Sequence, residues 1–487
     1  MAVCTRVSID PITRLEGHGK IEVFLNEEGN VEQAYLQIPE LRGFEKFCEG
    51  RPAEEMARIT PRICGVCPES HHMASTKALD ALWQVDPPRP AKKLRELFYC
   101  AHIIHSHTAH FYALAGPDFV VGPGAPKEER NILGLIAKVG LETGQEVIKH
   151  RSYAQHIQAM IGGKATHPVC GLPGGMSKPL TEEERQEIEK MALSLIDYAG
   201  MSLQIFRDLV LANKEYVELI LNDTYSLDIY SMGMVDENNH LNLYDGMMRV
   251  VDPQGKEFLK FHPSEYHEHF AEHVEPWSYL KFPYLRKVGW KGLKEGPDTC
   301  LVRVAPLGRL NAAEGMATPR AQAAYEELFS TLCRPAKATL GTHWARLVEI
   351  MFAAERLLEL AQDEEITSPD IRTIPTETPK EGIGMVEAPR GSLMHHYVTD
   401  KRGIIKKVNL VVATGHNYGA MNLSVDKAAK GLIKNGEVNE QAKNMIEMAF
   451  RAYDPCFACA THTLNGKLPL IIRVYDNKGE KIMDLDW

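Results

Sequence analysis

The sequence has few cysteines for its length and no apolar run long enough to cross a membrane. Its 487 residues include 10 cysteines, a density far below that of small disulfide-rich secreted proteins. A transmembrane helix needs about 20 consecutive apolar residues, and the apolar stretch VNLVVAT has only the length of a strand. The N-terminus also lacks the apolar segment and small-residue cleavage site of a secretory signal. These absences argue against a membrane span and a disulfide framework, and they favour a reducing, cytoplasmic location.

Positive charge is also scarce. The net charge is -10 at pH 7, and 44% of the residues are hydrophobic. Nucleic-acid binding requires concentrated lysine and arginine. We therefore expect a globular protein whose partners are proteins or small molecules and not nucleic acids.

The chain has no internal repeat and no low-complexity linker, and its longest periodic segments are helical. Helices are predicted over 91–115, over 127–161, from Glu182 onward after the N-cap Thr181, and over 318–361 with a kink at Pro335. A hairpin is predicted within the first fifty residues, short strands and loops over 223–317, a strand at GIIKKVNLVVAT, a helix at NEQAKNMIEMAFRAY and a hairpin at LPLIIRVYDNKGEKIMDL. The expected fold is mainly α with an α+β periphery: a central bundle of long helices with small N- and C-terminal β elements.

Two CxxC pairs lie near opposite ends of the chain. Cys64 and Cys67 occur in TPRICGVCPESHH, and Cys456 and Cys459 occur in RAYDPCFACATH. Thiolates three residues apart can converge on one metal, and they suit zinc, copper(I) or iron-bearing centres. A structural zinc site usually has about 15 to 20 residues between its pairs, far fewer than here. The spacing leaves open a zinc site that joins the ends of the fold and an independent role for each pair. Most of the six single cysteines are predicted to be buried apolar side chains.

Seven longer motifs accompany these pairs. In order they are TRLEGHGKIEV, RGFEKFCEGR, RICGVCPESHHMAS, HFYALAGPDF, GGKATHPVCGLPGG, EAPRGSLMHHY and DPCFACATH. Together they resemble the large subunit of nickel-iron hydrogenases over nearly the whole chain, although residues 223–317 carry none of them. The resemblance implies the hydrogenase large-subunit fold and an oxidoreductase that reversibly splits H2 into protons and electrons.

The resemblance also implies a ligand set. Cys64 and Cys456 would be terminal nickel ligands. Cys67 and Cys459 would bridge nickel to an iron that carries carbon monoxide and cyanide.

Four further residues match groups around this centre. Glu16 would relay protons beside Cys456, and Arg390 would overhang the open metal site with Asp118 as its ion-pair partner. His71 would donate a hydrogen bond to a bridging sulfur. Without the motifs these residues would be a surface glutamate, a structural ion pair and a core histidine.

A magnesium site is implied by Glu45, by the backbone carbonyl of Leu410 and by His462. Oxygen-rich, partly hydrated sites suit this ion. By itself Glu45 would be a solvated charge beside Lys46.

Four histidines crowd the helical segment 91–115. Their spacing could place pairs of them on one helical face, so a second metal is conceivable, but buried or proton-relaying histidines are the expected interpretation. They are His102, His105, His107 and His110.

The chain continues past the last motif. In the family a dedicated protease cuts after this histidine once nickel is in place. The resemblance therefore implies a single intertwined domain over 1–462 and a maturation extension over 463–487, and an unprocessed chain would hold an open or metal-free site. It also implies a nickel-insertion chaperone as a transient partner.

The remaining cysteines form no cluster suited to iron-sulfur wiring, so electrons must leave through other electron-transfer subunits, the first of them an iron-sulfur small subunit. The motifs are most similar to the cytoplasmic, cofactor-coupled branch, which is F420-non-reducing, viologen-reducing or NAD(P)-linked. The acceptor stays open among heterodisulfide reductase, a deazaflavin and NAD(P). The alternatives are a hydrogen-sensing regulator, whose members generally lack the tail, the quinone-site subunit of respiratory NADH dehydrogenase, which lacks the four cysteines, and a structural zinc protein.

Overall fold

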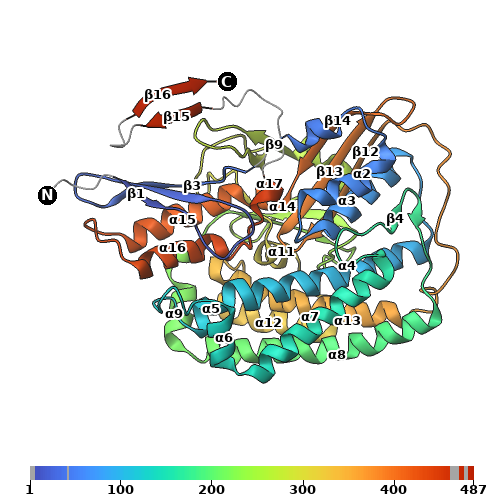
Figure 1. Ribbon diagram of the computed structural model, residues 1–487, viewed down its shortest axis with the longest axis horizontal. Helices are drawn as coiled ribbons and strands as arrows, with labels where there is room; N and C mark the ends of the chain where they lie inside the picture. Colours follow the sequence, from blue (N-terminus) through green and yellow to red (C-terminus); the bar gives the residue numbers. More distant parts are fainter. Residues whose placement is uncertain (1–5, 41–42, 461–470, 476–480, 487) are drawn as a thin grey trace.

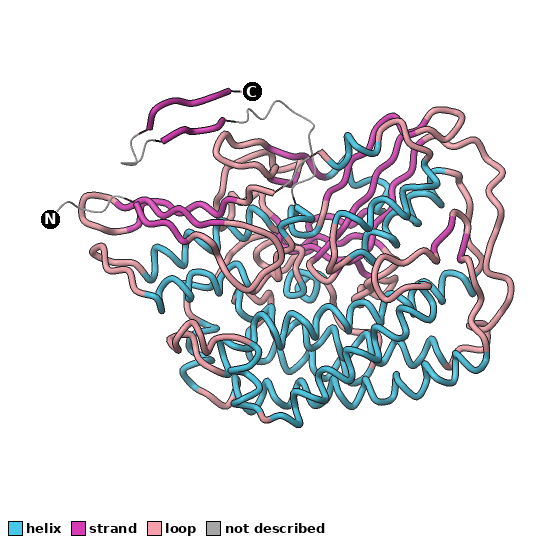
Figure 2. Tube along the Cα trace, viewed as in Figure 1, coloured by secondary structure: helices cyan, strands magenta, loops and turns pink. Residues whose placement is uncertain are grey.

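The computed structural model describes residues 6–40, 43–460, 471–475 and 481–486 (Figure 1). Long helices lie side by side along one side of the molecule, and the sheets and shorter helices lie on the other (Figure 2). The bundle therefore forms one flank of the fold rather than its centre. No helix in the described ranges is both long and apolar enough to cross a bilayer.

Five helices make up the bundle. They are α4 (Arg89–Ala109), α7 (Leu141–Gly162), α8 (Glu182–Phe206), α12 (Pro319–Leu332) and α13 (Thr342–Ala361). Helix α13 packs against α4, α8 and α12, and α7 packs against α4 and α8. The start of α8 is fixed by a capping box, in which Thr181 Oγ1 accepts from Glu184 N and Glu184 Oε2 accepts from Thr181 N.

Three of the predicted helical segments are broken where the backbone departs from helical geometry. The first continues beyond α4 as a π turn, His110–Ala115, and then as α5 (Gly116–Val120). The second divides into α6 (Ile132–Val139) and α7 at Gly140, whose φ is 93°. The last divides into α12 and α13, because Cys333 has a φ of 62° and the loop that follows contains Pro335.

The N-terminal sheet brings the two ends of the chain together. Its antiparallel strands β1 (Arg6–Ile9), β2 (Lys20–Leu25) and β3 (Val31–Gln37) lie in the order β1-β2-β3. Helix α15 (Tyr418–Leu432) packs against β3, and Asn422 Oδ1 accepts a hydrogen bond from Leu36 N at 3.0 Å. Residues separated by most of the sequence are therefore neighbours in the fold.

A second antiparallel sheet carries the motif EAPRG. It contains β12 (Glu381–Ala388), β13 (Gly391–Thr399) and β14 (Ile405–Val411) in that order, and α3 (Pro68–Leu82) packs on β12 and β13. The helix lies so close that a Cβ on Gly384 would meet the Ala74 carbonyl oxygen at 2.3 Å. This contact fixes the first cysteine pair, at the start of α3, relative to the β12–β13 hairpin.

The remaining elements are short. The predicted strands within 223–317 form a four-stranded sheet in the order β11-β6-β7-β8, and β15 pairs with β16 in the C-terminal hairpin. The predicted turn of that hairpin lies outside the described residues. The bounds are β4 (Gly171–Leu172), β5 (Gly175–Met176), β6 (Tyr230–Val235), β7 (Met247–Val251), β8 (Glu257–Phe261), β9 (Phe270–His273), β10 (Phe282–Leu285), β11 (Val302–Arg303), β15 (Ile471–Tyr475), β16 (Lys481–Asp486), α1 (Phe44–Cys48), α2 (Met56–Ile59), α9 (Lys214–Leu221), α10 (Tyr266–His269), α11 (Pro306–Ala312), α14 (Ala413–His416), α16 (Glu440–Arg451) and α17 (Phe457–Ala460).

Candidate metal centre

Cysteines from both ends of the chain meet in the interior. The sulfur atoms of Cys64, Cys67 and Cys456 all lie within 4.8 Å of one another, and all three residues are buried. The Cys64 and Cys456 sulfurs are 3.2 Å apart, well beyond the disulfide bond length of about 2.05 Å. Cys459 lies in α17, directly after Cys456, but its side chain is outside the described part of the chain. Three converging thiols are the ligands that a soft metal ion takes, so this donor set fits a thiolate-bound metal centre.

The loop between Cys64 and Cys67 is shaped around the first sulfur. The backbone N–H groups of Val66 and Cys67 both donate to Cys64 Sγ, at 3.2 Å each. Pro68 then starts α3 at a position where its missing N–H costs nothing. On the other side of the cluster, Cys456 N donates to Thr414 Oγ1 at 3.1 Å. The two cysteine segments are thus held by different parts of the fold.

Glu16 lies directly beside Cys456. Its Oε2 is 2.9 Å from Cys456 Sγ and accepts a hydrogen bond from Ala458 N at 3.2 Å. The backbone supports this contact, because Phe457 N donates to the Glu16 carbonyl oxygen at 3.1 Å. Burial raises the pKa of the Glu16 carboxyl above its ordinary value, and the Cys456 hydrogen bond only partly offsets this. A carboxyl with a raised pKa in contact with a thiol is suited to exchange a proton with it.

Arg390 lies on the opposite strand connection and contacts Asp454. Its Nε donates to the Asp454 backbone oxygen at 2.6 Å, and its Nη2 donates to Asp454 Oδ1 at 3.2 Å. Burial alone would lower the pKa of Arg390, but the Asp454 carboxylate and then the Cys456, Cys67 and Cys64 sulfurs more than compensate, so this pKa lies well above its ordinary value. A fixed positive charge therefore faces the sulfur cluster.

The predicted pairing of Arg390 with Asp118 is wrong. Asp118 lies on α5 and forms ion pairs with Arg14 and with Arg451, whose Nη1 is 2.7 Å from Asp118 Oδ2. These two guanidinium groups converge on it from the N-terminal loop and from α16, and they lower its pKa although burial alone would raise it. Sequence reasoning missed Asp454 as the partner of Arg390, although it stands two residues before Cys456 in the same motif.

His71 is fully buried on α3 and bonded to β13. Its Nδ1 is 3.1 Å from His395 Nε2, and His395 Nδ1 is 2.6 Å from the Tyr397 hydroxyl. Its backbone N–H donates to the Cys67 carbonyl oxygen at 3.4 Å. One ring nitrogen of His71 is therefore oriented by β13. Neither His395 nor Tyr397 was singled out from the sequence, although both stand in the motif EAPRGSLMHHY.

The predicted magnesium ligands are only partly within the described residues. Glu45 is buried on α1, Leu410 is buried on β14, and α1 packs against β14. His462 lies outside the described part of the chain.

The histidines of the first bundle helix are core residues. Burial lowers the pKa of His105 to about 3 and that of His107 to about 4, so both are neutral at physiological pH. Among the described residues, Cys64, Cys67 and Cys456 are the only group of three or more side chains placed to share a metal ion. The hydrogen-bond and ion-pair partners of these histidines are Glu69 and Ser70 for His102, Glu349 for His107 and the Arg451 carbonyl for His110.

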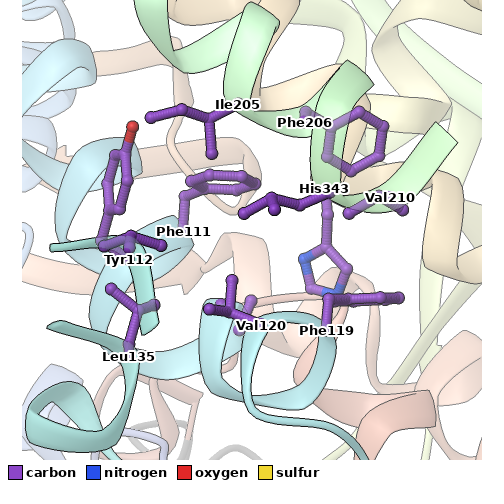
Figure 3. Close-up of a pocket in the computed structure, with 13 residues that line it drawn as sticks. Phe111, Tyr112, Phe119, Val120, Leu135, Ile205, Phe206, Val210 and His343 are labelled. Carbon is purple, nitrogen blue, oxygen red and sulfur yellow. The ribbon is translucent and has the colours of Figure 1, made fainter. Parts of the chain in front are cut away.

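An apolar cavity lies away from the sulfur cluster, between the π turn, α5, α6, the end of α8 and α13 (Figure 3). Phe111, Phe119 and Phe206 line it, and His343 contributes an imidazole ring to its wall. Burial lowers the pKa of His343 to about 3, so this ring is neutral. A cavity of this chemistry can take a small apolar molecule but not an ion.

Comparisons with known proteins agree with this geometry. The family model described as nickel-dependent hydrogenase matches residues 42–130 and 232–462, and a HoxL-like model matches residues 6–41. The chain is 48% identical to an iron-sulfur subunit of the F420-non-reducing hydrogenase of Archaeoglobus profundus, with 98% of each chain covered. It is 38% identical to the beta subunit of the NAD-reducing hydrogenase HoxS of Cupriavidus necator, again over 98% of each chain.

The fold agrees as well. A crystal structure of an NAD+-reducing [NiFe]-hydrogenase in the H2-reduced state superposes with a TM-score of 0.87 at 36% identity, covering 94% of this chain and 99% of that one. The chain belongs to the nickel-dependent hydrogenase family, as the large, catalytic subunit of a nickel-iron hydrogenase.

Proposed function

We propose that the four cysteines hold the nickel and iron of this hydrogenase, with Cys64 and Cys456 as terminal nickel ligands and Cys67 and Cys459 as bridges to iron. The observation that carries the proposal is the convergence of Cys64, Cys67 and Cys456 within 4.8 Å. When bound, the two metals supply the Lewis acid that polarises H2. We also propose that the iron carries carbon monoxide and cyanide, as the resemblance implies.

The chain's own residues manage the proton and the charge. Glu16, 2.9 Å from Cys456 Sγ, takes the proton from that sulfur and starts its path to the solvent. Arg390 presents its guanidinium to the open side of the cluster, and Asp454 fixes the orientation of that group. His71 donates to a bridging sulfur, and its buried place one turn after Cys67 supports this role.

A magnesium ion bound by Glu45, the Leu410 carbonyl and His462 is a further part of the proposal. The packing of α1 against β14 supports it, because this contact brings the elements of the first two ligands together. Carboxylate and carbonyl oxygens with water are the ligands that magnesium prefers.

Electrons leave in the cytoplasm through further electron-transfer subunits, the first of them an iron-sulfur small subunit. The names of the relatives support this, because one is an iron-sulfur subunit of an F420-non-reducing enzyme and another belongs to an NAD-reducing enzyme. The higher identity to the first favours an acceptor other than F420, and NAD(P) is the second candidate.

Metal analysis of the purified, mature enzyme tests the proposed centre. We expect nickel and iron at about one atom each per chain, because four thiolates shared between two metals accommodate one of each. Inductively coupled plasma mass spectrometry measures both, with zinc measured in the same run. Stoichiometric zinc without nickel would contradict the proposal and support a structural zinc site.

Residues 463–487 are proposed to be a maturation extension that a dedicated protease removes after His462, once a chaperone has inserted nickel. Intact-mass spectrometry of active enzyme is expected to show a chain that ends at His462, and the full-length chain is expected to be inactive. Active enzyme that still ends at Trp487 would rule out the cleavage.

A further inference from the structure

Arg390 stands at the tip of a β-hairpin that points into the core. Ala388 pairs with Gly391 across β12 and β13, which leaves Pro389 and Arg390 as a two-residue connection. Such connections usually lie at the surface, because their backbone carbonyls need water as a partner. Here Ala388 is 3% exposed and Arg390 is 4% exposed. Another group must therefore satisfy the tip.

Arg309, on α11, supplies that group. Its Nη1 donates to the Ala388 carbonyl oxygen at 2.5 Å and to Glu387 Oε2 at 3.1 Å, and its Nη2 lies 3.4 Å from the Pro389 carbonyl oxygen. One guanidinium thus contacts the three consecutive residues that precede Arg390. Arg309 itself is fully buried, so water does not compete for these contacts.

Glu349, on α13, holds Arg309 in place. Arg309 Nε donates to Glu349 Oε1 at 2.8 Å, and Nη2 donates to Glu349 Oε2 at 2.6 Å, which is a bidentate ion pair. His107 Nε2 lies 2.8 Å from the same carboxylate. Burial would raise the pKa of Glu349, but Arg309 outweighs it and lowers this pKa to about 2, so the carboxylate is ionised. The bundle thereby anchors the guanidinium that contacts the hairpin tip.

We propose that Arg309 is a positioning residue for Arg390: by binding the buried hairpin tip in place of water, it sets the position of the Arg390 guanidinium beside the cysteine cluster. The inference rests on the active-site role proposed above for Arg390. Lysine could not replace Arg309, because a single ammonium cannot bind Glu349 in a bidentate manner and also reach the carbonyls of the tip.

The test compares Arg309→Lys, Arg390→Lys and the double variant in the assembled, metal-loaded enzyme. Displacement of a catalytic group by about 1 Å can cost about 100-fold in rate, so we expect Arg309→Lys to lower kcat by about that factor. If Arg309 acts through Arg390, the double variant should turn over within about 2-fold of Arg390→Lys alone. The electron paramagnetic resonance spectrum of the nickel centre should change in the same way in both single variants, while the nickel content stays unchanged.

Arg95 provides the matched control. It is also a buried arginine, and it binds the Asp80 carboxylate at 2.5 Å and the carbonyls of Leu172 and Gly175 at 3.0 and 2.8 Å. Arg95→Lys should lower the melting temperature as Arg309→Lys does but leave both kcat and the nickel spectrum as in the wild type. Equal losses of activity in the two variants would show that Arg309 is merely structural and would overturn the inference.

The outcomes separate the two proposals. Losses that multiply in the double variant, or a normal rate in Arg309→Lys beside an impaired Arg390→Lys, overturn the role of Arg309 alone. A normal rate in Arg390→Lys overturns the proposed role of Arg390 and the inference with it. If Arg309→Lys does not accumulate, Glu349→Gln loosens the same guanidinium and should give a smaller loss of rate that again does not add to that of Arg390→Lys. Losses that do add in that combination overturn the inference.

Discussion

Replacing Cys67 with serine is expected to abolish H2 oxidation and to remove both metals from the protein. Cys67 shares the buried cluster with Cys64 and Cys456, and a hydroxyl is a poor ligand where a soft thiolate is required. Loss of an outer-shell partner of a metal typically costs 10- to 100-fold, so loss of a direct ligand should cost more than about 100-fold in activity. H2-dependent viologen reduction and nickel and iron analysis measure the two effects.

Cys300→Ser is the matched control for this variant. Cys300 is equally buried but lies outside the cluster, so its substitution should leave nickel, iron and turnover close to the wild-type values. A Cys67→Ser enzyme with full metal content and normal turnover would show that this cysteine is not a ligand. Equal losses in both variants would point to a folding defect instead of the loss of a metal ligand.

The meeting of the cysteine pairs could be predicted from the motifs but not from their spacing. Spacing alone left a zinc site and two separate sites open, because thiolate chemistry is similar in all of them. The convergence depends on the packing of α15 against β3, which joins the two ends of the chain. Contacts of this kind are tertiary, and a local pattern of residue types does not encode them.

The partner of Arg390 shows the same limit at a finer scale. Two buried carboxylates, Asp118 and Asp454, compete for nearby arginines, and the family motif favoured the first. The structure pairs Asp118 with Arg14 and Arg451 because α5 faces α16, and this leaves Asp454 for Arg390. Which carboxylate meets which guanidinium depends on helix orientation rather than on residue type.

Arg309 could not be found from the sequence. It lies within the stretch 223–317, which carries none of the hydrogenase motifs, and PLGRLNA has no pattern that marks a buried arginine. The helix positions were predictable from periodicity, but the breaks at Gly140 and Cys333 were not, since they depend on backbone conformations with positive φ.

Replacing Glu16 with glutamine is expected to lower H2 turnover by about 100- to 10,000-fold, the usual contribution of a positioned proton-transfer group. The amide has nearly the same shape and can still accept the hydrogen bond from Ala458 N, so the backbone around Cys456 should remain in place. It cannot, however, take up and release the proton of the thiol 2.9 Å away. Viologen reduction measures turnover, and the exchange of D2 with solvent protons measures proton transfer directly.

Glu22→Gln is the control for this variant. Glu22 is also a buried glutamate near the N-terminus, but it lies on β2 and pairs with Arg6 and Lys20, so its substitution should change stability and not exchange. Nickel and iron content must be equal in Glu16→Gln and the wild type, because a loss of metal would show that Glu16 acts in assembly instead. Exchange at the wild-type rate in a metal-loaded Glu16→Gln enzyme would exclude Glu16 from the proton path.

The aspartate variant separates the carboxyl group from its position. Glu16→Asp retains a group that can carry a proton but withdraws it from Cys456 by about the length of one C–C bond, roughly 1.5 Å. Proton transfer needs hydrogen-bond contact or one bridging water, so D2 exchange should fall between the wild-type and glutamine rates. An aspartate enzyme as slow as the glutamine enzyme would mean that the 2.9 Å contact itself is required. An aspartate enzyme at the wild-type rate would mean that a water bridges the longer gap, and in both cases the chemistry of residue 16 is that of an acid and not of a structural hydrogen-bond partner.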